Sequence, residues 1–186
     1  MSAENYIQDM VTRFRVILDA HDRHLECFCR YAIQVEGWLK GELLCFLDSE
    51  KVAGRLVNFD REVQLDVGRK KIDLHLEIPV DTAILDAWIE LKHWLIGYQK
   101  GYKLNAQFYF SDPTSVGIKP DVEKLVKIKE GSKYLLILAT ANPGDKEWLN
   151  GVIGFNKKYP HLSVESLTNP AEFPQSYFLG LLEVSA

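Results

Sequence analysis

Residues 87–94, AWIELKHW, form an apolar run that contains one glutamate and one lysine. A run of this length and composition predicts a β-strand. Because successive side chains of a strand point to opposite faces, Glu90 and Lys92 share a face with Trp88 and Trp94. Two charges on one face of a core strand indicate either a solvated cross-strand ion pair or a functional site.

The preceding segment, IDLHLEI at residues 72–78, alternates in the same way. Its four aliphatic side chains share one face, and Asp73, His75 and Glu77 share the other. If the two strands are neighbours, Asp73 lies beside Glu90. Two close carboxylates repel each other unless a positive charge lies between them, and Mg²⁺ binds one or two carboxylates together with waters. The pattern therefore predicts a cation site, with a solvated strand face as the structural alternative.

The remaining segments predict a mixed sheet between helices. Apolar residues at three- and four-residue steps predict helices, and alternating or continuous apolar runs predict strands. Along the chain we expect an N-terminal helix within residues 1–33, a helix at 34–48, strands at 62–67, 72–78 and 87–94, a helix at 119–129, a strand at 133–140, a helix at 145–158 and closing strands at 161–167 and 176–185. This order predicts one α/β domain spanning residues 1–186, with a core at 34–140 and a C-terminal helix and edge strands at 141–186.

The composition bounds the class of protein. With 47% hydrophobic residues in a chain of 186, a core can be buried without disulfides. Three cysteines do not make a disulfide framework, and the polar N-terminus is not typical of a signal peptide, so we expect a reduced, cytoplasmic setting without membrane contact. The net charge of −4 means that any binding of nucleic acid must be local.

The helix at 34–48 supplies a third acidic candidate, Glu42. On a helical wheel this residue lies within about 60° of Val35, Trp38 and Leu39, at the centre of the apolar stripe. A buried glutamate is uncommon unless it is paired or binds a ligand. A glutamate paired with a basic or hydroxyl group, or an exposed helix with two apolar sides, is the alternative.

Together these segments resemble the PD-(D/E)XK, or restriction-endonuclease-like, nuclease superfamily. The resemblance is carried by Glu42 in WLKGELLCFL, Asp73 in GRKKIDLHLEI, and Glu90 and Lys92 in AWIELKHW. The segments KPDVEKLVKI and KYLLILAT match the helix and strand that follow in that superfamily. The match covers roughly residues 34–140 and implies a restriction-endonuclease-like core (helix, three strands, helix, strand) with an N-terminal helical extension.

The resemblance also implies a chemistry. Enzymes of this group are hydrolases, endonucleases or exonucleases, that cut DNA phosphodiesters with Mg²⁺, for which Mn²⁺ can substitute. Asp73 and Glu90 would bind the metal, Lys92 would position the attacking water or stabilise the phosphate, and Glu42 would add a direct or outer ligand. The sequence departs from the eponymous motif because an isoleucine precedes Asp73 where the motif has proline. Two other acids, Glu77 and Asp81, remain rivals of Asp73.

Basic and aromatic residues near this strand suit phosphates and stacked bases. We expect a local nucleic-acid-binding surface made by the residues Arg69, Lys70, Lys100, Tyr102 and Lys103. A solvated loop is the structural alternative. Lys124 and Lys127, on the helix at 119–129, are expected on its solvated side.

The sequence therefore predicts a Mg²⁺-dependent nuclease whose partner is nucleic acid, DNA in the first place. The alternative function is a catalytically inactive domain of the same fold that binds nucleic acid or a protein partner. A structural scaffold with solvated strand faces is a further option. The sequence leaves a homodimer open.

Overall fold

The computed structural model describes residues 3–65, 70–95, 117–140, 157, 164–166 and 177–184. Helices within these ranges are α1 (Ala3–Ala20), α2 (Asp22–Arg30), α3 (Glu36–Val52) and α5 (Lys119–Leu125). Strands within them are β1 (Asn58–Gln64), β2 (Lys71–Val80), β3 (Ala83–Leu95), β4 (Ser132–Thr140), β5 (Val164–Ser166) and β6 (Tyr177–Glu183). The expected helix at 145–158 lies outside the described residues, except for Lys157.

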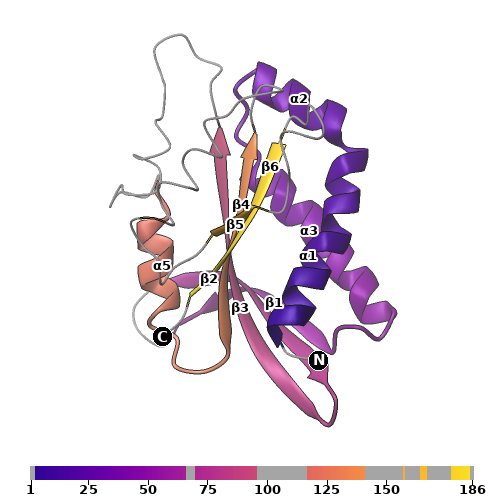
Figure 1. Cartoon of the computed structure of the whole chain (residues 1–186), viewed down its shortest axis with the longest axis vertical. Helices are drawn as coiled ribbons and strands as arrows, with labels where there is room; N and C mark the ends of the chain where they lie inside the picture. The colour runs from indigo at the N-terminus through magenta and orange to yellow at the C-terminus, as the bar shows by residue number, and fades with distance from the viewer. Residues whose placement is uncertain are drawn as a thin grey trace.

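The strands form one mixed sheet in the order β1-β2-β3-β4-β6-β5. Strands β3 and β4 are parallel, and the other neighbouring pairs are antiparallel. Helices α1, α2 and α3 cover one face of the sheet, and α5 covers the other (Figure 1). The predicted α/β class with a mixed sheet between helices is confirmed.

Several expected boundaries differ from those observed. The single N-terminal helix expected within residues 1–33 is two helices, because the helix is interrupted by a turn at His21 between α1 and α2. Strand β1 begins at Asn58, earlier than expected, since its residues pair with β2 from there to Gln64, with the exception of Glu62. Helix α5 ends at Leu125 and continues as a turn. These shifts follow from pairing and packing rather than from local periodicity.

Two apolar cores lie on the two faces of the sheet. The first contains Leu74 of β2 and Ile89 of β3 and packs under α1, α2 and α3. The second contains Trp94 and Leu125 and lies under α5. Ile72, expected to share a face with Leu74, belongs instead to the second core. The regular alternation of β2 is therefore broken at Asp73, the residue between them.

No helix in the described part of the chain is both long and apolar enough to cross a membrane.

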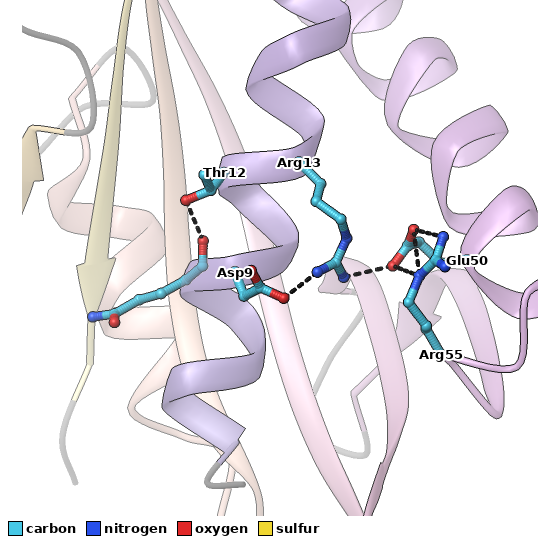
Figure 2. A network of polar contacts seen from close by, with 6 residues as sticks. Asp9, Thr12, Arg13, Glu50 and Arg55 are labelled. Atoms are coloured by element: carbon cyan, nitrogen blue, oxygen red, sulfur yellow. Dashed lines mark hydrogen bonds and ion pairs between the residues drawn. The ribbon is translucent and has the colours of Figure 1, made fainter.

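A buried ion pair ties α1 to the end of α3. The Glu50 side chain is 2% exposed, and it accepts hydrogen bonds from Arg13 at 2.6 Å and from Arg55 Nη2 at 2.7 Å (Figure 2). Arg13 also bonds Asp9, one turn earlier on α1. Burial would raise the pKa of Glu50, but the two guanidinium groups outweigh it and leave that pKa below its ordinary value. The pair fixes the position of α3 along α1.

Candidate functional site

The site begins where β2 and β3 stop pairing. Their ladder ends at the pair Leu74–Ile89, whereas β3 stays paired with β4 as far as Leu95. Asp73 and Glu90 come one step beyond the last pair, and the Asp73 carboxylate is close enough to raise the pKa of Glu90. The edge of β3 that follows has lost its partner strand, so its backbone amides must find other acceptors.

Carboxylates take the place of the missing strand. The Leu91 amide donates to Asp73 Oδ2 at 2.9 Å. Two residues later, the His93 amide donates to the carboxylate of Glu36, in the first turn of α3. Both amides point from the same edge of β3, since alternate residues of a strand donate to the same side. Two acidic side chains from different elements are therefore anchored next to each other.

Glu36 was not among the residues expected from the sequence. Burial raises its pKa, Lys92 lowers it, and Asp73 and Asp121 raise it again, so all three groups lie within electrostatic range. Its position at the start of α3 places it at the positive end of the helix dipole. A sequence signal existed, because Glu36 and Lys40 are spaced i, i+4 on the helix.

Asp73 accepts hydrogen bonds from a lysine as well as from a backbone amide. Lys40 Nζ donates to Asp73 Oδ1 at 2.6 Å and to Glu62 of β1 at 2.5 Å. The Asp73 side chain is 16% exposed and that of Lys40 is 21% exposed. Helix α3 thus delivers a cation and, through Glu36, an anion to the end of the β2–β3 ladder.

Glu90 is the most buried acid of the site. Its side chain is 3% exposed, and Oε1 lies 2.7 Å from Lys124 Nζ but outside hydrogen-bond geometry. Burial raises the pKa of Glu90 to about 8, against the opposing effect of the Lys124 ammonium. Asp73 and Asp121 raise that pKa further, which places both carboxylates close to Glu90. At neutral pH the Glu90 carboxyl therefore holds its proton.

Helix α5 brings the remaining charges from the other face. Lys92 Nζ lies 2.9 Å from Asp121 Oδ2, and Lys124 Nζ lies 3.8 Å from Asp121 Oδ1. Lys124 also donates to the backbone oxygen of Lys71 at 3.0 Å. The expectation that Lys124 is solvated is wrong, because its side chain is only 17% exposed and reaches back to the sheet. Lys127 is exposed, as expected.

These residues are called the gap cluster, and its members are Glu36, Lys40, Asp73, Glu90, Lys92, Asp121 and Lys124. It contains four carboxyl groups and three ammonium groups. Among the residues that the structure describes, no three Asp, Glu, His or Cys side chains stand ready to hold a metal ion. The ammonium groups supply the positive charge in this arrangement.

Glu42 does not join the gap cluster, and its expected burial was wrong. Its side chain is 29% exposed, and Oε2 lies 3.9 Å from His21 Nε2. Helix α3 turns Leu39, Leu43 and Leu47 towards the sheet. Trp38, expected in the central stripe, contacts Phe28 of α2 instead of the sheet. Glu42 lies one turn after Trp38 on the same side of α3, so it also points away from the sheet.

The rival acids Glu77 and Asp81 lie towards the other end of the β2–β3 ladder, away from the gap cluster. Glu77 is paired with Asp86 in the ladder, and Asp81 is exposed at the turn between β2 and β3. Of the expected nucleic-acid-binding residues, Lys70 is described and exposed. The others, Arg69, Lys100, Tyr102 and Lys103, lie outside the described residues.

His93 positions the start of α3 against the sheet. It is 6% exposed, and burial lowers its pKa to about 4, so the imidazole is neutral. Nδ1 lies 2.8 Å from Gln34 Oε1 and 3.4 Å from the Val35 amide nitrogen, and Nε2 lies 2.9 Å from Thr140 Oγ1. This bridge holds Glu36, the residue after Val35, beside the unpaired edge of β3.

Comparisons with protein-family models, with curated proteins and with solved structures find no match.

Proposed function

We propose that the chain is a metal-dependent phosphodiester hydrolase of the restriction-endonuclease-like group and that it cuts DNA. The observation that carries the proposal is the convergence at the end of the β2–β3 ladder. Asp73, Glu90 and Lys92, chosen from the sequence, meet there with Glu36. The element order α3, three strands, α5 and β4 is the one that the resemblance implies.

The carboxylate oxygens of the gap cluster are of the kind that a hard divalent cation takes, although the described residues form no ready metal site. Mg²⁺ prefers oxygen ligands and takes one or two carboxylates with several waters. Two buried carboxylate oxygens, Glu90 Oε1 and Asp121 Oδ2, make no hydrogen bond of good geometry although ammonium groups lie near them. Such oxygens have unused acceptor capacity. Asp73 and Glu90 would hold the ion, with Glu36 as the third acidic group in place of Glu42.

The chain's own residues supply positioning and charge. Asp73 and Glu36 are fixed by the Leu91 and His93 amides, so both carboxylates are oriented before any substrate arrives. Lys92 places an ammonium group within reach of the same space, where it can stabilise charge that grows on phosphate oxygens. A bound divalent ion supplies water activation and neutralises phosphate charge. In the reaction, water adds to phosphorus and the bond from phosphorus to the leaving sugar oxygen breaks.

A divalent ion bound at Glu90 would have to displace the proton of that carboxyl group. Glu90 is protonated near neutral pH in the cation-free protein because burial disfavours its charge. A divalent ion beside Glu90 would replace that proton, and Lys124 would have to move away from Oε1. We therefore expect metal binding to release a proton and to tighten as pH rises towards 8.

The test is cleavage of plasmid DNA and labelled oligonucleotides in Mg²⁺ or Mn²⁺, with EDTA as the blank. Glu90→Gln, Asp73→Asn and Lys92→Ala proteins should lose activity by about a hundredfold or more, in line with the loss of an electrostatic catalytic group. Glu36→Gln should do the same, whereas Glu42→Gln, the matched change on the same helix, should cut as the unmodified protein does. The proposal is rejected if no substrate is cleaved, or if the Glu90→Gln and Lys92→Ala proteins cleave as fast as the unmodified protein.

One observation favours the second candidate, an inactive domain of the same fold that binds nucleic acid or a protein partner. Each of Asp73, Glu90 and Asp121 lies within 2.9 Å of a lysine ammonium, so each acidic group already has a cationic neighbour without a metal. Binding of DNA without cleavage, at an affinity that falls with salt, would support this candidate.

A further inference from the structure

A cavity of about 470 Å³ opens beside the gap cluster, on the face of the sheet that α5 covers. It lies between the end of the β1–β2 hairpin and the segment that joins α5 to β4. Gln64, Leu65 and Lys70 line it from the hairpin, and Lys127 and Lys129 line it from the joining segment. Its volume lies within the range of pockets that bind one small-molecule-sized group.

The indole of Trp88 lines the cavity and is held in a fixed orientation. It stacks on His75, with ring centroids 4.1 Å apart and planes inclined by 27°. Its Nε1–H donates to the backbone oxygen of Glu130 at 3.1 Å. A partly buried aromatic ring that is held by a stacked neighbour and a hydrogen bond offers a surface on which another flat ring can stack.

The rim of the cavity is basic although the chain is acidic overall. Lys70, Lys127 and Lys129 are exposed at the rim, and Glu130 is the one acid among the lining residues. In a chain with a net charge of −4, this is a local concentration of positive charge. Exposed ammonium groups around a flat apolar surface suit a ligand with an anionic backbone and a planar ring.

The cavity and the gap cluster are adjacent along β3. Trp88 and Glu90 are two residues apart on the same face of the strand, a separation of about 7 Å. Lys124 joins the two regions, since it contacts Glu90 and also bonds the backbone of Lys71, next to Lys70. A nucleic-acid strand whose phosphate reaches the gap cluster would thus have a neighbouring nucleotide at the cavity.

We propose that this cavity binds one unpaired nucleotide of single-stranded DNA, with the base stacked on Trp88 and the flanking phosphates on Lys70, Lys127 and Lys129. The inference rests on the proposed function and narrows its substrate to DNA with an unpaired segment next to the cut. A paired base lies inside the duplex stack and would have to be extruded first, which costs free energy. An unpaired base enters without that cost.

The test measures binding without cleavage, in EDTA, by fluorescence anisotropy of a labelled twelve-residue oligo-dT and of a duplex of the same length. The protein with Lys127→Gln and Lys129→Gln together should bind the single strand roughly tenfold more weakly. The slope of log affinity against log salt should fall by about 1.4, or about 0.7 for each lost phosphate contact. Lys51→Gln, which removes one exposed charge from α3 on the opposite face, should bind as the unmodified protein does.

Tryptophan fluorescence gives a second readout. Stacking of a base on Trp88 should quench emission on titration with oligo-dT, and Trp88→Phe, which keeps a ring on His75, should remove that quenching. Equal binding of single strand and duplex, unchanged binding by the double lysine variant, or unchanged quenching in Trp88→Phe overturns this inference even if Mg²⁺-dependent cleavage is observed. Selective single-strand binding with no cleavage in any metal supports the cavity and rejects the nuclease.

Discussion

Glu90→Gln should change how the stability of the protein depends on pH. In the folded protein, burial raises the pKa of Glu90 from its ordinary value of 4.5 to about 8. The folded state therefore holds the Glu90 proton more tightly than the unfolded state does. Stability linked to this group is fully present below about pH 4.5 and is lost as pH rises through about 8.

The size of the effect follows from the shift. A difference of 8 − 4.5, at about 1.4 kcal/mol per pH unit, gives a total on the order of 5 kcal/mol. Between pH 6.5 and 8, stability should fall by up to about 2 kcal/mol in the unmodified protein. This window lies above the range in which His93, whose pKa burial lowers from 6.5 to about 4, contributes. A glutamine at position 90 cannot ionise, so this fall should disappear.

The assay is urea denaturation followed by circular dichroism at closely spaced pH values, in EDTA, for both proteins. The quantity compared is the difference in the free energy of unfolding, because titrations common to both proteins cancel in it. Parallel curves for Glu90→Gln and the unmodified protein between pH 6.5 and 8 would mean that Glu90 titrates normally. The argument from its burial would then be wrong.

Three further outcomes are expected. Glu50→Gln should lower the free energy of unfolding, measured by urea denaturation, by about 2 to 3 kcal/mol, less than for a fully buried pair because both guanidinium groups are partly exposed. Asp9→Asn, at the exposed end of the same network, should cost under about 1 kcal/mol. Since the Glu50 pKa is lowered, the extra stability should be present above about pH 4.5 and vanish as pH falls below it. Gly131→Ala should cost about 1 to 3 kcal/mol, because φ is +79° and a Cβ would lie 2.7 Å from the Asp86 carbonyl oxygen, whereas Gly41→Ala in α3 meets nothing within 4 Å and should be neutral or stabilising by under about 1 kcal/mol. Millimolar Mn²⁺ should raise the Tm of the unmodified protein more at pH 8 than at pH 6.5 and should not raise that of Glu90→Gln; equal shifts in both proteins would place the ion elsewhere.

Local periodicity was sufficient to predict much of the fold. The period of two predicted strands β2 and β3, which contain Asp73, Glu90 and Lys92, and the apolar run of β4 predicted a strand covered on both faces. The amino acids of a strand determine its faces because alternate side chains are forced to opposite sides. The sequence also determined that these faces would be charged inside a core strand.

Only the tertiary structure decided where the ladder ends and which groups meet there. The break at Asp73 sends Ile72 into the second core and exposes the Leu91 and His93 amides to carboxylates. The rotation of α3 against the sheet selects Glu36 instead of Glu42, and the reach of Lys124 to Glu90 crosses from α5 to β3. Strand divergence and helix rotation are set by packing between residues far apart in the chain, which no local period records.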